Sequence, residues 1–408
     1  MTTNKAHRSR TAALIALLSI LVVVLAVGAG LGAAGLLGGP SPTSDSEASD
    51  GAEPEDAADE ATDPADAPGD EDAEATEESD ESDETGESDG SDADGSPVPS
   101  TVERTRQCPE ATKTVTDAGT LRTALESALP GDVIRLEPGT YEGEFVAQTA
   151  GTQEEPITLC GDQDAVLDGG ESDGGYTLHL DGASHWHLLG FQVTGGQKGV
   201  MVDGTDHTVI EGLTVSDIGD EAIHLRTHSS HNTVVGNHVF RTGQRKPKFG
   251  EGIYIGSAES NWEDLTGGEP DTSDENLIED NRIEDVTAEA IDVKEGTTGG
   301  IIRNNTFDGS GMEGDDFADS WVDVKGNDWL IEGNIGTTSP ADGFQTHEIL
   351  DGWGTGNIFR HNTAELVDGD HGFALTPSLD NVVECNNEVY DADKELTNTE
   401  CTEDTDAS

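Results

Sequence analysis

The chain has 408 residues, and its 85 acidic residues far outnumber its 20 basic ones, which leaves a net charge of −65. Binding to nucleic acid requires a basic surface, so this composition argues against a nucleic-acid-binding protein. The acidic residues are spread unevenly, because residues 41–100 alone hold 24 Asp and Glu and no Lys or Arg.

The first 40 residues form a separate segment. They contain no acidic residue, and three basic residues precede an apolar run over 12–37 that is long enough to span a bilayer. We interpret residues 1–40 as an uncleaved signal anchor, with the basic end in the cytoplasm and the rest of the chain on the extracellular face. The alternative is a signal peptide cleaved near Ala29, which would release a secreted protein, because Gly and Ala accumulate toward the end of the run.

Residues 41–105 are predicted to be a disordered acidic linker. Their Ser, Ala, Gly, Thr, Pro and acidic residues cannot bury a core, and their like charges repel one another. A solvated stalk between membrane and domain is favoured over an acidic interaction tail. We place the folded domain at 106–402 and a short disordered tail at 403–408. Residues 101–408 still hold 61 acidic and 17 basic residues, as expected of a secreted protein from a salty environment.

Four cysteines lie in the predicted domain. Outside the cytoplasm they indicate two disulfides, and their spacing fits no common zinc motif. Three pairings are possible. We predict Cys108–Cys160 and Cys385–Cys401, because each of these would clamp one end of a repeat array, where fraying begins.

Residues 117–129 predict an amphipathic helix. Asp117 or Thr120 can cap its start, and Pro130 with Gly131 ends it. Its apolar residues recur at helical spacing, at Leu121, Ala124, Leu125 and Ala128. Such a helix would cover the open end of a stacked core, as a capping element must.

Short segments of one form recur about every 22 to 38 residues after residue 199. Each has a polar residue, a small or aromatic one, and then an apolar–polar–apolar strand that ends on a polar residue. This alternation is typical of half-buried β-strands, and its recurrence indicates a solenoid. The strands align on Ile223, Ile253, Ile291, Val322, Phe344 and Phe373.

A second column supports the stacking. One turn per coil has a recurrent position. Phe191 and Leu213 occupy it first, and the later coils place Asn there, at Asn237, Asn281, Asn305, Asn334, Asn362 and Asn386. Asn tolerates the left-handed backbone of a sharp turn, and stacked Asn side chains can bond to the coils above and below. We interpret this column as structural.

Coils of this length, with three short strands and an Asn ladder, resemble the right-handed parallel β-helix of the pectate-lyase-like superfamily. The resemblance covers about residues 113–395. It implies an all-β fold, a single-stranded parallel β-helix with a short N-terminal capping helix. It does not imply one activity, because the superfamily includes lyases, hydrolases, epimerases, tailspikes and adhesins.

Stacked strands would place carboxylates about 4.8 Å apart on one outer face. Such carboxylates repel unless a cation lies between them, and oxygen-rich clusters suit Ca²⁺. The predicted metal ligands are Glu251, Glu289, Asp292 and Asp323, joined from the loop over 311–319 by Asp315 and Asp316. The alternative is an acidic surface ladder that Lys294 and Lys325 partly neutralise.

Lys294 and Lys325 stack beside Asp292 and Asp323, and we predict these four residues as catalytic. Stacked ammonium groups lower each other's pKa, which a Lys needs in order to act as a base. The alternative is two surface ion pairs of little energetic value. Glu289 and Lys294 are similar to the Glu…Lys strand of the chondroitinase B and alginate lyase family, which implies that Glu289 holds a metal and Lys294 is the base. Lys325 or His347 stands where that family has an Arg.

The substrate-binding prediction includes a basic cluster at Arg245, Lys246 and Lys248, which precedes Glu251 and should overlie the same face. In so acidic a domain it indicates a grip on an acidic polymer, or else a loop tethered by ion pairs. Further candidates on this face are Tyr254, Arg226 and His347.

Three functions are compatible with these residues. The first is a monomeric polysaccharide lyase that acts on a uronate-containing polymer with Ca²⁺. The second is a glycoside hydrolase that uses paired carboxylates such as Asp292 and Asp323. The third is a non-catalytic surface protein that binds carbohydrate or another wall component.

Overall fold

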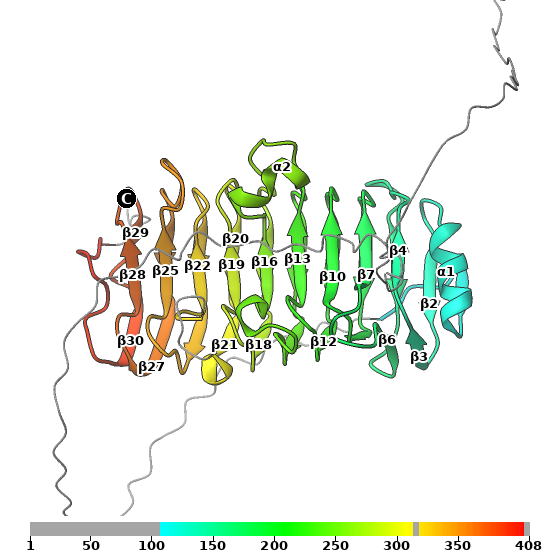
Figure 1. Ribbon diagram of the computed structural model, residues 1–408, viewed down its shortest axis with the longest axis horizontal. Helices are drawn as coiled ribbons and strands as arrows, with labels where there is room; N and C mark the ends of the chain where they lie inside the picture. Colours follow the sequence, from blue (N-terminus) through cyan, green and yellow to red (C-terminus); the bar gives the residue numbers. More distant parts are fainter. Residues whose placement is uncertain (1–106, 313–317, 404–408) are drawn as a thin grey trace, which may run out of the picture. The chain divides into compact units, whose positions relative to one another are not determined.

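The computed structural model describes residues 107–312 and 318–403, which form an all-β, right-handed parallel β-solenoid of about ten turns. Three parallel sheets run along it, and each complete coil contributes one strand to each sheet (Figure 1). The segments predicted as anchor, linker and tail lie outside the described residues, apart from Glu403 at the start of the tail. No helix in the described part has the length and apolar character needed to cross a membrane.

The nine-stranded sheet carries the predicted polar columns. Its strands are β4 (Phe145–Ala147), β7 (Tyr176–Asp181), β10 (Lys198–Asp203), β13 (Ile223–Arg226), β16 (Ile253–Ile255), β19 (Ile291–Val293), β22 (Val322–Val324), β25 (Phe344–His347) and β28 (Phe373–Thr376).

The eleven-stranded sheet shows why the coils stack. Inward residues lie directly above one another, from Ile210 through Val234 to Ile278 and Ile302, and all are fully buried. Its strands are β1 (Lys113–Val115), β2 (Val133–Leu136), β5 (Ile157–Cys160), β8 (Trp186–Leu189), β11 (Val209–Glu211), β14 (Thr233–Val235), β17 (Leu277–Glu279), β20 (Ile301–Arg303), β23 (Leu330–Glu332), β26 (Ile358–Arg360) and β29 (Val382–Val383).

The ten-stranded sheet completes each coil. Its strands are β3 (Gly139–Glu142), β6 (Ala165–Asp168), β9 (Gln192–Thr194), β12 (Thr214–Ser216), β15 (His238–Phe240), β18 (Arg282–Glu284), β21 (Thr306–Asp308), β24 (Ile335–Thr337), β27 (Thr363–Gly369) and β30 (Glu388–Ala392). Short helical turns interrupt the coils at η1 (Pro247–Phe249), η2 (Glu259–Asn261), α2 (Trp262–Leu265) and η3 (Gly309–Gly311).

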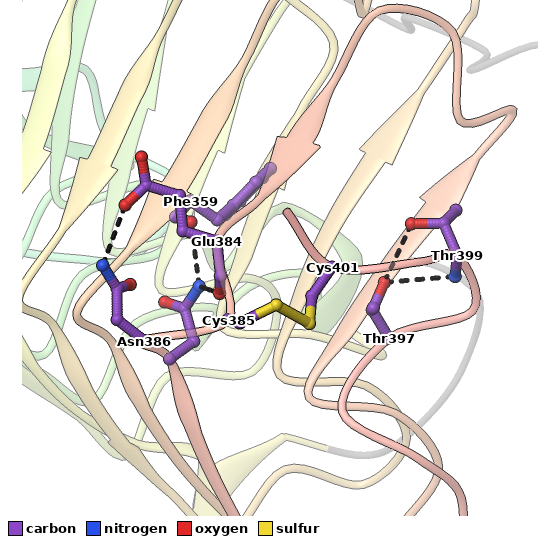
Figure 2. Close-up of a disulfide and its surroundings, with 8 residues drawn as sticks. Phe359, Glu384, Cys385, Asn386, Thr397, Thr399 and Cys401 are labelled. Atoms are coloured by element: carbon purple, nitrogen blue, oxygen red, sulfur yellow. Dashed lines mark hydrogen bonds between the residues drawn. A yellow bond between two sulfur atoms is a disulfide. The ribbon is translucent and has the colours of Figure 1, made fainter. Parts of the chain in front are cut away.

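Both ends of the solenoid are closed as predicted. Helix α1 (Ala118–Glu126) has Asp117 as its N-cap and buries Leu121, Ala124 and Leu125 at the first coils (Figure 1, cyan). The disulfides are Cys108–Cys160 and Cys385–Cys401, which confirms the predicted pairing. Figure 2 shows the second, which ties the end of the chain to the last coil, where Thr402 pairs with Glu384.

The Asn ladder is confirmed, but two details of its prediction are wrong. The last rung is Asn387, because the last coil has one more residue between strand and rung; Asn386 instead bonds to Glu384. The left-handed residue is also the one before the rung, as at Asp280 or His361, for the rungs from Asn237 to Asn362. Each ladder Asn points inward, where its amide donates to a carbonyl of the preceding coil and to the next rung, as Asn281 does to Val234 and Asn305.

Candidate functional site

The predicted polar columns lie on the face of the nine-stranded sheet. Register places His224, Tyr254, Asp292, Asp323 and Gln345 in consecutive coils at one position. The apolar residues on either side of each, such as Ile291 and Val293, point into the core and are fully buried. The alternation of each strand therefore turns these polar side chains away from the core.

A continuous chain of ion pairs occupies the middle of this face. The Lys294 Nζ lies 2.9 Å from Asp292 Oδ2, and the Lys325 Nζ lies 2.9 Å from both Asp292 Oδ1 and Asp323 Oδ2. His347 Nδ1 lies 2.9 Å from Asp323 Oδ1 and closes the chain. The four residues predicted as catalytic thus meet, and each is at most 8% exposed. Their ion pairs are buried, unlike the surface pairs of the alternative interpretation.

These contacts keep three members of the ion-pair chain charged: Lys325, Asp323 and His347. Burial opposes the charge on Lys325, but Asp292 and Asp323 outweigh it and raise the pKa of Lys325 above its ordinary value. Burial likewise opposes the charge on Asp323, yet His347 and Lys325 lower its pKa overall. Asp323 in turn raises the pKa of His347 to about 9. Lys325, Asp323 and His347 are therefore charged at neutral pH.

Two further carboxyl groups lie next to Asp292 of the ion-pair chain. Oxygen atoms of Glu251, Glu289 and Asp292 lie within 4.8 Å of one another, and all three residues are buried. Burial, and then the neighbouring carboxylates, raise the pKa of Glu251 well above its ordinary value and that of Glu289 to about 8. Glu251 Oε2 is buried without a hydrogen-bond partner. The group must therefore hold protons or a cation.

The donor set fits a calcium ion only in part. Glu251 and Glu289 are hard oxygen ligands of the kind that Ca²⁺ takes. Both oxygens of Asp292 are already bonded to lysines, and Asp323 bonds to Lys325 and His347, so these two predicted ligands are poorer candidates. Asp315 and Asp316 lie outside the described residues. Asp319, at the edge of that segment, has a pKa raised to about 6 by burial.

Tyr254 lies beside Lys294, at one end of the ion-pair chain. Its ring contacts the His224 ring edge-on at 4.4 Å between centroids, and the Lys294 Nζ lies 5.1 Å from its centroid. Burial and then Asp292 raise the pKa of the phenol well above its ordinary value. The phenol therefore stays protonated and can donate a proton or a hydrogen bond.

The remaining basic candidates differ in how they are held. Arg226 bonds to Asp203 at 2.8 Å and to Tyr176, and Arg245 bonds to the buried Asp220 at 2.5 Å. Arg226 thus joins the ends of two neighbouring strands, β13 and β10. Arg245 holds its loop against Asp220, as in the tethered-loop alternative. Lys246 and Lys248 instead flank the Phe249 ring, at 5.4 and 4.8 Å from its centroid, and neither forms an ion pair within the described part of the chain.

The sequence interpretation missed polar residues of the same face. Lys198, which binds Glu221 Oε1 at 2.9 Å, belongs to the coil before the aligned strands. Pairing of Val200 with Ile223 shows that the alignment should have started one coil earlier, although the position that pairs with His224 holds the apolar Met201 there. Glu221, His224, Ser320 and Gln345 were in the aligned coils but were not selected, and each has a buried polar atom without a partner.

Two family models match the chain. The model described as "Pel9A-like, right handed beta helix region" matches residues 105–257, and that of the periplasmic copper-binding protein NosD matches residues 197–403, about half of the chain. No curated protein matches the sequence of this chain.

Solved structures similar to the chain include two lyases. Alginate lyase from Paenibacillus sp. str. FPU-7 is 37% identical with a TM-score of 0.66, covering 71% of this chain and 100% of its own. Pectate lyase Pel9A is 16% identical with a TM-score of 0.51, covering 68% of this chain and 72% of its own, which shows a shared fold. The chain therefore belongs to the pectate-lyase-like superfamily of right-handed parallel β-helix proteins, within which it matches the Pel9A-like and NosD models and the alginate lyase.

Proposed function

We propose that the protein is a polysaccharide lyase that cleaves alginate, or a closely similar uronate polymer, by β-elimination. The observation that carries this proposal is the buried chain of ion pairs, which holds two lysines on the sheet face beside a protonated phenol. The similarity to an alginate lyase over the whole length of that protein supports the substrate class.

Elimination from a uronate requires three groups. A positive charge must stabilise the substrate carboxylate while the α-proton leaves, a base must take that proton, and an acid must protonate the leaving oxygen. Lys325 suits the first role, because Asp292 and Asp323 keep it charged. Lys294 is assigned as the base and Tyr254 as the acid, because the amino group of Lys294 and the phenol ring lie together.

The proton and electron balance closes on these residues. Lys294 must first release the proton of its ion pair with Asp292 to solvent. The neutral amine then takes the α-proton, and the C–H electron pair forms the new double bond. The bond to the glycosidic oxygen breaks, and the Tyr254 hydroxyl gives its proton to that oxygen. The proton now on Lys294 returns to the phenolate, which restores both side chains.

A calcium ion would be held by Glu251 and Glu289, and when bound it would supply further positive charge for the substrate carboxylate. Glu251 Oε2, which lacks a partner, supports this assignment. In its absence the raised pKa values of the two residues mean that protons take its place.

A glycoside hydrolase is the second candidate. It needs one protonated carboxyl group, and Asp323 cannot provide it, because His347 and Lys325 keep its pKa low against the effect of burial. Glu289 favours this alternative, since its pKa of about 8 retains a proton at neutral pH.

The lyase proposal is tested by incubating the full protein with alginate and with polygalacturonate, with calcium or with a chelator. Wild type should form an unsaturated, ultraviolet-absorbing product from alginate, and Lys294→Met should form none. Lys394→Met is the matched control, because Lys394 also binds an aspartate, Asp370, but on the exposed surface. New reducing ends without absorbance would support the hydrolase, and binding without cleavage would support a carbohydrate-binding protein.

The protein is further proposed to act outside the cytoplasm, where its substrate would be found. Its two disulfides support this location, because they persist in oxidising compartments, and so does the match to a periplasmic family.

A further inference from the structure

Two buried acceptor atoms lie one coil before Tyr254. Glu221 Oε2 and His224 Nδ1 are buried without a hydrogen-bond partner among the described residues, and the two side chains are 6% and 4% exposed. Buried polar groups are nearly always satisfied, and an unsatisfied one costs free energy. The two side chains are neighbours, with His224 Nδ1 3.7 Å from Glu221 Oε1.

The contacts of His224 define which of its nitrogens accepts. Nε2 lies 2.9 Å from the Gly256 carbonyl oxygen, which can only accept, so Nε2 carries the hydrogen. The 3.7 Å between Nδ1 and the Glu221 carboxylate is too long for a hydrogen bond. Burial, and then Lys198 and Arg226, lower the pKa of His224, so the ring is neutral and Nδ1 presents a lone pair.

Glu221 presents the second acceptor. Its Oε1 accepts from Lys198 Nζ at 2.9 Å, and no described donor reaches Oε2. Lys198 and Arg226 place positive charge next to both acceptors, which disfavours a metal ion at this point. Neutral O–H donors remain as the fitting ligand groups.

We propose that Glu221 and His224 form a hydroxyl-binding subsite, one coil toward the N-terminus from Tyr254, that takes two neighbouring hydroxyl groups of one sugar unit. One hydroxyl donates to His224 Nδ1 and the other to Glu221 Oε2. The ligand class is a vicinal diol, which a 4-linked uronate carries at its second and third carbons. This inference rests on the proposed function for the identity of the polymer, and it makes Glu221 and His224 specificity-determining rather than catalytic residues.

Two substitutions of His224 separate its two nitrogens. His224→Gln can keep the donor to Gly256 while it removes the ring acceptor, and His224→Asn can keep an acceptor near Nδ1 while it removes that donor. Both are made in the Lys294→Met protein, which should bind without cleaving. Binding of alginate oligosaccharides is measured by calorimetry, with the second and third hydroxyls either free or O-acetylated.

The Lys294→Met parent should bind the free oligosaccharide about tenfold more tightly than the acetylated one, as expected for loss of donors to buried acceptors. His224→Gln should bind both equally weakly, and His224→Asn should still prefer the free form. Glu221→Gln, which replaces the acceptor Oε2, is the second variant and should also lose the preference.

The subsite is overturned if the parent does not discriminate or does not bind, or if folded His224→Gln discriminates as the parent does. Thermal unfolding of each variant identifies loss of fold. A wild-type protein that binds with this preference but forms no unsaturated product would overturn the lyase proposal and leave the subsite standing. A wild-type protein that forms the unsaturated product but binds both oligosaccharides equally would overturn the subsite and leave the lyase proposal standing.

Discussion

The Asn ladder and the face of the nine-stranded sheet both repeat a polar residue once per coil, yet the two columns differ in how their members interact. Each ladder amide carries donor and acceptor, so Asn281, Asn305 and Asn334 are satisfied by one another and by backbone groups of neighbouring coils, without a counterion or ligand. The sheet face stacks carboxylates and cations, which compensate each other at Asp292 and Lys325 but not at Glu251. Stacking identical neutral amides stabilises a coil, whereas stacking identical charges requires a counterion, a proton or a ligand.

Removal of the shared counterion of the sheet face should have the largest effect. Asp292→Asn leaves Lys294 and Lys325 buried without the carboxylate that joins them. We expect the free energy of unfolding to fall by about 3–5 kcal/mol and lyase activity to be lost. Denaturant unfolding measures the first. Asp370→Asn, which breaks the exposed pair with Lys394, should cost about 1 kcal/mol or less; equal losses would contradict a special role for the buried chain.

Removal of one ladder rung should destabilise the fold without affecting the chemistry. Asn387→Ala deletes buried hydrogen bonds to Asn362, Phe359 and Glu384 and should cost about 1–3 kcal/mol. Asn386→Ala, one residue earlier, is the matched control and should cost less, because Asn386 is only partly buried and lies outside the ladder. Specific activity of the folded fraction should be unchanged in both. The reverse order of stabilities would restore Asn386 as the rung.

The carboxyl pair should make stability depend on pH in chelator. Glu289 has a folded pKa of about 8 against an ordinary 4.5, so between these values the folded state holds a proton that the unfolded state has released. Stability should therefore fall as pH rises from about 5 to 8 and level off above that range. Calcium should raise the unfolding temperature most at the high-pH end of this range. Glu289→Gln should weaken both effects, and an unchanged pH profile would argue against a protonated pair.

The smallest expected effect concerns the exposed basic loop. Lys246 and Lys248 lie beside Phe249 and can reach an acidic polymer only through solvent-screened contacts. The double substitution to Ala should raise KM for alginate by about two- to fivefold, with little change in kcat. The difference should disappear at high salt, because mobile ions screen such charges. A salt-independent loss of kcat would instead indicate that the loop shapes the site.

The outcome at single residues shows how far sequence reasoning reaches in a solenoid. Alignment of the repeats was enough to predict that four residues are neighbours, because stacked coils share one register. These residues are Asp292, Asp323, Lys294 and Lys325. The same logic failed at Asn386, where one inserted residue shifts the rung. It also did not reveal that Arg226 and Arg245 form ion pairs with Asp203 and Asp220, which lie outside the aligned strands. The assignment of the two arginines to substrate binding stays a prediction.

The local pattern of apolar and polar residues was enough to determine the coil repeat, the inward residues and the capping helix, because each depends on spacing along the chain or on stacking in register. Tertiary structure alone decided which charges compensate one another. Burial and contacts between coils decide three protonation states. They keep Lys325 charged, they keep Glu289 protonated at neutral pH, and they leave His224 with a lone pair on Nδ1. Those energies are set by distances of a few ångströms in a desolvated site, and sequence spacing does not specify such distances.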